Sequence, residues 1–87
     1  MKLDQRFITH VTKGEHFIIS TGGTGFKGII QNNETAAFIV DCLKEDTTIS
    51  EIVDKILAEY CGVERVDAEL DVAEIIDQLR SIGALEE

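Results

Sequence analysis

The sequence of 87 residues contains no proline and only two cysteines. Without proline, glycine and asparagine must provide the breaks between elements. Cys42 and Cys61 form no C-x-x-C pair and no dense pattern, which excludes a disulfide framework. Each lies in or beside a predicted helix, so we expect both thiols to be small buried side chains.

Basic residues are also scarce. Eight Lys and Arg oppose seventeen Asp and Glu, which gives a net charge of −9. A nucleic-acid-binding surface or a polybasic membrane-binding surface needs excess positive charge, so neither class of partner is expected. The charge is uneven, because residues 1–31 carry four basic and two acidic groups, whereas residues 32–87 carry four basic and fifteen acidic groups.

Long apolar segments are missing as well. No apolar run approaches the ~20 residues that span a bilayer, and the first residues lack the hydrophobic region of a secretion signal. Together with the few cysteines, this predicts a cytoplasmic location. The length suits one domain over residues 1–87, and 44% hydrophobic residues suffice for one small core.

Catalytic motifs are absent from the sequence. It contains no G-x-S-x-G, no H-E-x-x-H and no nucleotide-binding P-loop. The Gly-rich segment Gly22–Gly25 leads into a predicted strand and not into a helix, so a turn explains it better than a phosphate cradle. We therefore expect no enzyme activity and no cofactor.

Residues 1–31 have the pattern of three short strands. Arg6–Val11 and Glu15–Ser20 are rich in β-branched and aromatic residues. Thr12-Lys13-Gly14 between them fits a three-residue hairpin loop. A third strand at Phe26–Gln31 completes an antiparallel meander.

The three-residue loop sets the expected pairing of the hairpin. Val11 would face Glu15, and His10 would face His16. Two facing imidazoles are only half of a metal site, so ordinary surface histidines are the simpler reading and no metal is predicted. The same register predicts a core face made of Phe7, Val11, Phe17 and Ile19.

After residue 31 the apolar period changes from 2 to 3.6, which predicts three helices over residues 32–87. The first starts at Asn32 or Asn33, and the second at Thr48, where the spacing to Glu51 matches a capping box. The third begins between Asp67 and Asp71 and ends near residue 82. The expected fold is α+β and winged-helix-like, with a three-stranded meander followed by three helices.

Two other function classes fit this outline in part. A winged-helix DNA-binding regulator would present the third helix to phosphates, but that helix is acidic. An acyl-carrier-like protein is also small and acidic, but it needs a serine within a motif such as Asp-Ser-Leu. Here Ser50 lies between Ile49 and Glu51.

The third strand is the most informative element. It lies at an edge of the meander, and Gly28 in its middle is typical of a bulge or of close approach by another backbone. An open edge can add an extended peptide as a further strand, or can pair with a second copy in a homodimer. The alternative is an ordinary edge guarded by Lys27.

The order of several segments resembles the PqqD-like family. These segments are Gly28-Ile29-Ile30-Gln31-Asn32-Asn33-Glu34-Thr35-Ala36-Ala37-Phe38-Ile39, Thr48-Ile49-Ser50-Glu51-Ile52-Val53 and Leu79-Arg80-Ser81-Ile82-Gly83-Ala84-Leu85. The resemblance implies a peptide-recognition domain that binds the leader segment of a ribosomally made precursor peptide. It further implies presentation of that peptide to a maturase, often a radical S-adenosylmethionine enzyme.

In this family the leader adds as a strand between the third strand and the third helix. The resemblance therefore implies a cleft between Lys27–Gln31 and the helix Val72–Ile82, with ladder hydrogen bonds from the backbone of Ile29 and Gln31. The expected peptide-binding residues are Lys27, Gly28, Ile29, Ile30, Gln31, Ile75, Gln78, Leu79 and Ile82. The acidic helix predicts an extended ligand with apolar anchors and some Lys or Arg.

Overall fold

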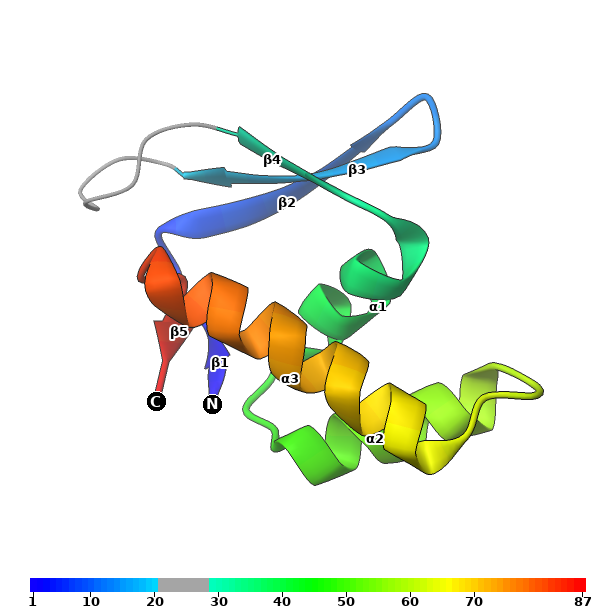
Figure 1. The fold of residues 1–87 in the computed structure, drawn as a ribbon. Coiled ribbons are helices and arrows are strands. Elements are labelled where there is room, and N and C mark those ends of the chain that lie inside the picture. The colour runs from blue at the N-terminus through cyan, green and yellow to red at the C-terminus, as the bar shows by residue number, and fades with distance from the viewer. Residues whose placement is uncertain (21–28) are drawn as a thin grey trace.

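A computed structural model describes residues 1–20 and 29–87. For residues 29–32 only the backbone is described. In chain order the elements are β1 (Lys2–Leu3), β2 (Phe7–Thr12), β3 (Glu15–Ser20), β4 (Ile29–Asn32), α1 (Glu34–Cys42), α2 (Ile49–Glu59), α3 (Arg65–Ser81) and β5 (Leu85–Glu86) (Figure 1). The fold is α+β with three helices, as the sequence predicts. No described helix is long and apolar enough to cross a membrane.

The larger sheet contains three antiparallel strands in the order β2-β3-β4. The β2–β3 loop has two residues, Lys13 and Gly14, whose φ angles are 51° and 76°. Two successive positive φ angles are typical of a type I′ turn, which matches the twist of the flanking strands. The predicted three-residue loop was therefore wrong, and Thr12 pairs with Glu15.

This change in loop length shifts the hairpin register by one residue, which turns one strand's side chains to the other face. Val11 pairs with His16, and His10 pairs with Phe17. The two histidines therefore lie on opposite faces of the hairpin, so the facing pair was wrong. Among the described residues, no group of three His, Cys, Asp or Glu could hold a metal ion.

The predicted core face of the hairpin was right for Phe7 and, for the same reason, wrong for Phe17 and Ile19. Phe7 is 3% exposed and its face is shared with Ile18, which is 1% exposed. Phe17 and Ile19 lie on the other face and are half-buried. Val11 shares the face of Phe7 but is 60% exposed, because it lies near the turn and beyond the core.

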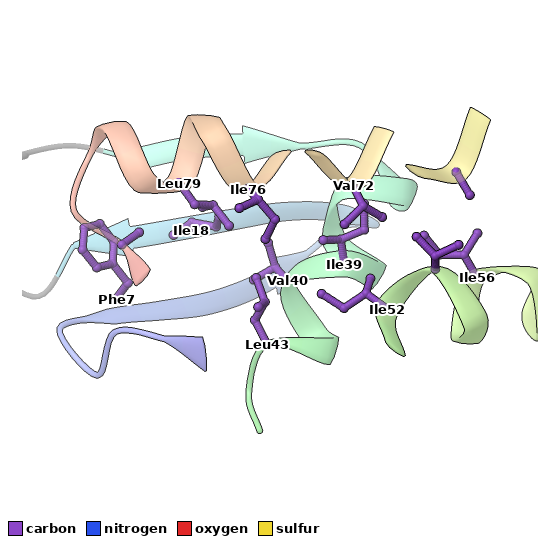
Figure 2. Close-up of a cluster of buried hydrophobic side chains, with 13 residues drawn as sticks. Phe7, Ile18, Ile39, Val40, Leu43, Ile52, Ile56, Val72, Ile76 and Leu79 are labelled. Atoms are coloured by element: carbon purple, nitrogen blue, oxygen red, sulfur yellow. The ribbon is translucent and has the colours of Figure 1, made fainter. Parts of the chain in front are cut away.

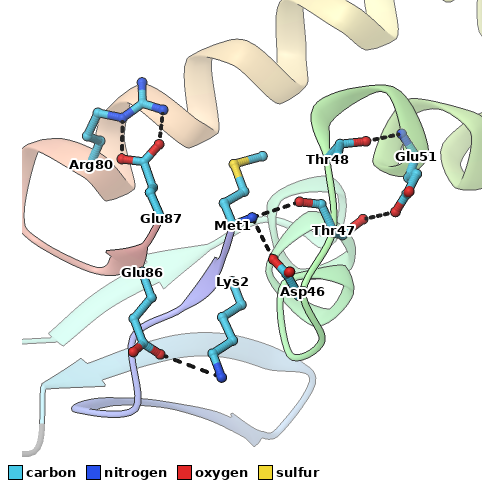
Figure 3. A network of polar contacts seen from close by, with 9 residues as sticks. All are labelled: Met1, Lys2, Asp46, Thr47, Thr48, Glu51, Arg80, Glu86 and Glu87. Carbon is cyan, nitrogen blue, oxygen red and sulfur yellow. Dashed lines mark hydrogen bonds and ion pairs between the residues drawn. The ribbon is translucent and has the colours of Figure 1, made fainter.

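The two ends of the chain pair in a second, two-stranded sheet, which the sequence analysis missed. Leu3 of β1 faces Leu85 of β5, and both pack against the core. Polar contacts hold the ends in place (Figure 3). The terminal ammonium of Met1 lies 2.7 Å from the carboxylate of Asp46, and Arg80 lies 2.7 Å from Glu87. The ammonium lowers the pKa of Asp46 through a hydrogen bond and its charge.

The turn between β1 and β2 contains a buried carboxylate. Asp4 is 8% exposed and accepts hydrogen bonds from the backbone N–H of Arg6 at 2.9 Å and from its guanidinium at 2.8 and 2.9 Å. These bonds lower the pKa of Asp4 from 3.8 to about 2. The backbone N–H of Asp4 donates to Ala84, so the same turn is bound to the end of the chain.

α1 and α2 begin at N-cap residues that the sequence predicts. The side chain of Asn33 accepts the N–H of Ala36, and that of Thr48 accepts the N–H of Glu51. α3 begins at Arg65, two residues before the predicted range. Its N-cap, residue 64, makes no side-chain capping hydrogen bond, so the sequence carries no cap signal there.

The core lies between the helices and one face of the sheet. Figure 2 shows Val72, Ile76 and Leu79 of α3 packed towards Ile18 of β3 and Ile39 of α1. Cys42 is half-buried beside this cluster, and burial raises the pKa of its thiol. Cys61 is exposed after the end of α2, so the expectation that both cysteines are buried was wrong.

Candidate functional site

The edge of the larger sheet at β4 directs backbone groups outward. A two-residue turn closes on a hydrogen-bonded pair, Thr12 with Glu15, and such pairs alternate along an antiparallel ladder. Phe17 and Ile19 therefore bond to β2, whereas His16 and Ile18 bond to β4. Ile30 and Asn32 face those residues, so their backbone groups lie within the ladder.

The remaining β4 residues have the opposite orientation. The N–H and C=O groups of Ile29 and Gln31 point away from β3, towards the open edge. Within the part of the chain that the structure describes, no other strand pairs with this edge. These are the two residues whose backbone the resemblance to the PqqD-like family assigns to ladder bonds with a peptide. Lys27 and Gly28, also assigned to the site, lie outside the described residues.

α3 lies on the β4 side of the sheet. Figure 2 shows this arrangement, with β2 at the far edge of the sheet. The buried stripe of α3 faces the core and consists of Ala68, Val72, Ile76 and Leu79. What lies on either flank of this stripe decides which side chains are available to a ligand at β4.

Two ion pairs identify the flank that faces away from β4. Arg65 bonds to Asp54 of α2 at 2.9 Å, and Arg80 bonds to Glu87 beside β5 at 2.7 Å. α2 and the C-terminal end of the chain lie on the side of α3 that faces away from the larger sheet (Figure 1). Both arginines therefore lie on the flank that is turned towards α2 and the chain ends.

Three of the four helix residues expected in the site lie on the other flank. Ile75, Gln78 and Ile82 follow one another at spacings of three and four, which places them on one side of the helix. Ile75 and Ile82 are half-buried, and Gln78 is exposed. Leu79 differs, because it is 3% exposed and belongs to the core cluster.

The same flank includes an acidic residue that the sequence analysis did not assign to the site. Asp71 lies one turn before Ile75 and is exposed. The i, i+4 spacing from Ile75 was the signal that could have identified it. Both arginines of α3 lie on the opposite flank, so Asp71 gives this flank a negative charge beside two half-buried isoleucines.

The chain is similar to known proteins both in sequence and in fold. The chain matches the family model of coenzyme PQQ synthesis protein D (PqqD) over residues 15–85. A comparison with curated proteins finds no match. Two solved structures have the same fold, and each contains a leader peptide.

The first is TbiB1 in complex with the TbiA(beta) leader peptide, which has a TM-score of 0.81 and 24% identity, covering 99% of this chain and 95% of that chain. The second is lasso peptide synthetase B1 complexed with the leader peptide, which has a TM-score of 0.78 and 26% identity, covering 99% of this chain and 96% of that chain.

Proposed function

The chain belongs to the PqqD family, and from this membership we propose that it is a non-catalytic recognition module for the leader segment of a ribosomally made precursor peptide. Both similar structures are complexes with leader peptides, which supports this proposal. The observation that carries it is the open edge of β4 beside the half-buried flank of α3. In the winged-helix-like reading of the fold, the hairpin of β2 and β3 forms the wing.

The leader binds as a strand antiparallel or parallel to β4. The N–H and C=O of Ile29 and Gln31 supply up to four ladder bonds, each worth about 0.5–1.5 kcal/mol net of water. These bonds fix the register and say nothing about sequence, because every peptide has a backbone. Selectivity for one leader therefore depends on side-chain contacts with the neighbouring wall.

That wall is the α3 flank of Ile75, Gln78 and Ile82. Successive side chains of an added strand point to opposite faces, so every second leader residue faces α3. Fully burying one Leu or Ile of the leader against this flank contributes about 1.5–3 kcal/mol. Asp71 on the same flank favours a Lys or Arg in the leader, and this part of the affinity decreases with added salt.

The chemistry on the precursor belongs, in this proposal, to a separate modifying enzyme. The module holds the leader and brings the precursor to that enzyme, for which a radical S-adenosylmethionine maturase is one candidate. Holding the leader on one protein raises the effective concentration of the segment to be modified. A DNA-binding role fits less well, because α3 would present exposed carboxylates to phosphates.

The test takes candidate leader peptides from short reading frames beside the gene, titrates them into isotope-labelled protein and follows the titration by NMR. We expect chemical-shift changes at residues 29–31 and along the α3 flank. Gln31→Pro removes an outward N–H but no bond to β3, so it should weaken binding while the β2–β3 signals stay unchanged. Val11→Pro, the matched change at the far edge, should leave leader binding intact.

The proposal fails if the shift changes spare β4 and α3, or if Gln31→Pro binds the leader as tightly as the unchanged protein. Equal loss of binding in Gln31→Pro and Val11→Pro would also contradict it, because the two substitutions close opposite edges of the sheet.

A further inference from the structure

The far edge of the larger sheet, at β2, has a second set of outward backbone groups. The alternation that turns Ile29 and Gln31 outward on β4 does the same for Thr9 and Val11 on β2. Within the described residues, no strand pairs with this edge. Phe7, at the start of β2, donates its N–H to Asp4 at 3.0 Å, so the open part of the edge begins after it.

This edge lacks the features that usually protect an exposed strand. Natural proteins guard open edges with charged residues, proline, bulges or very short strands. β2 has six residues, Phe7–Thr12, with no charge, no proline and no glycine. Ile8 is 49% exposed and Val11 is 60% exposed. A long, uncharged and partly apolar edge of this kind favours pairing with another chain.

A cavity lies where this edge approaches α1. It has a volume of about 380 Å³. Its lining combines Val11 and His16 of the hairpin, Ala37, Phe38 and Val40 of α1, and Tyr60 at the end of α2. The rings of Phe38 and Tyr60 meet edge to face, with centroids 5.5 Å apart. A strand added to β2 would direct every second side chain towards this aromatic lining.

Charge around the cavity limits which chain can occupy it. Glu34 and Asp41 line it from α1, together with Lys44. Lys44 is paired with Asp41 at 3.1 Å, and no described cation forms an ion pair with Glu34. A basic residue in the incoming segment would complement Glu34. A second copy of this chain fits less well, because each copy carries a net charge of −9.

We propose that β2 and α1 form a second strand-docking site, which binds an extended segment of the modifying enzyme that carries alternating apolar residues and a Lys or Arg. The proposal rests on the proposed function, since a leader carrier must also contact the enzyme it serves. β2 and β4 are opposite edges of one sheet, so the enzyme segment and the leader bind at the same time without competing.

The test uses a phage-displayed library of random peptides, because the enzyme segment is not identified. The library is selected on the full chain carrying Gln31→Pro, which closes the β4 edge. We expect the selected peptides to alternate apolar residues and to contain Lys or Arg. They should bind the unchanged protein and the Gln31→Pro variant equally, and the Val11→Pro variant about tenfold or more weakly.

A second variant keeps the test informative if Val11→Pro disturbs the hairpin. Val11→Glu changes an exposed side chain and leaves every backbone bond in place, but adds a carboxylate to the cavity lining. It should weaken the same peptides. Selected peptides that bind both Val11 variants as tightly as the unchanged protein would overturn the proposal.

Two further outcomes are decisive. Failure of the library to yield any peptide that distinguishes the edges would overturn the second site. Sedimentation equilibrium could instead show a dimer that Val11→Pro dissociates. The occupant of the second site would then be a second copy of this chain and not a segment of the enzyme. Neither outcome affects the leader site, because its test depends on Gln31→Pro and the leader peptide.

Discussion

Leu79 separates the two roles of α3, because it was expected in the peptide site but lies in the core. It is 3% exposed and packs in the cluster with Ile18 and Ile76 (Figure 2). Leu79→Ala removes roughly three carbon groups from that cluster, at about 0.8 kcal/mol each. The cavity left behind adds to this loss, so we expect unfolding to require about 3–4 kcal/mol less free energy.

A loss of this size is large for a chain of 87 residues. At about 0.05–0.15 kcal/mol per residue, the whole domain has a free energy of unfolding of roughly 4–13 kcal/mol. In domains of this size, 1 kcal/mol shifts the melting temperature by about 4–8 °C. Leu79→Ala should therefore melt at least ~12 °C below the unchanged protein.

The assay is urea unfolding followed by far-ultraviolet circular dichroism, with thermal melting as a second measurement. Gln78→Ala is the matched control, because Gln78 is the preceding residue on the same helix and is exposed. It should change the free energy of unfolding by less than about 0.5 kcal/mol. If Leu79→Ala is as mild as Gln78→Ala, then Leu79 is not a core residue and the assignment of the α3 faces is refuted.

Three further predictions concern other parts of the chain. Lys13 has φ 51°, which costs an ordinary side chain about 1 kcal/mol, so Lys13→Asn should stabilise the hairpin and raise the melting temperature. The pKa of Asp4 is lowered to about 2 in the fold, so its contribution is complete above pH ~4 and is lost as the pH falls towards 2. Acid titration of the melting temperature should show this loss, and Arg6→Gln should make it smaller. The thiols should react with a disulfide reagent in two phases, the fast one from exposed Cys61 and the slow one from half-buried Cys42. Cys61→Ser should abolish the fast phase, and a fast phase that persists would contradict the assignment.

The helices could be predicted because their signals are local. Apolar residues recur every three to four positions, and the side chains of Asn33 and Thr48 each accept a backbone N–H that the start of a helix leaves without a partner. Where that signal is missing, the prediction was wrong, as at Arg65. The pairing of β1 with β5 left no signal at all, because strands of two residues have no period.

The hairpin shows that correctly predicted strands can still be paired in the wrong register, which assigns their side chains to the wrong faces. Both strands were identified, but Lys13 in a left-handed conformation does not match the Asn-Gly or Asp-Gly pattern of a type I′ turn. The predicted loop was one residue too long, so it placed His10 opposite His16. In the structure, His10 is opposite Phe17. The register of a hairpin depends on the length and type of its turn, which the composition of the strands does not reveal.

The candidate site was accessible from the sequence only in part. The outward backbone groups of Ile29 and Gln31 follow from the ladder register, which depends on the true loop length. The sequence could not show which side chains of α3 face the core and which face a ligand, because Leu79 and Ile82 belong to one apolar stripe. The ion pairs of Arg65 and Arg80, which identify the two flanks, join residues of different elements.

The pairing of β1 with β5 has a practical consequence for protein engineering. It brings the first and last residues side by side (Figure 1), so a short linker can join them, or this chain can be inserted into a surface loop of another protein. An N-terminal tag is less neutral, because it turns the Met1 ammonium into an amide. The ion pair with Asp46 would then be lost, so a tag at the C-terminal end preserves more of the native contacts.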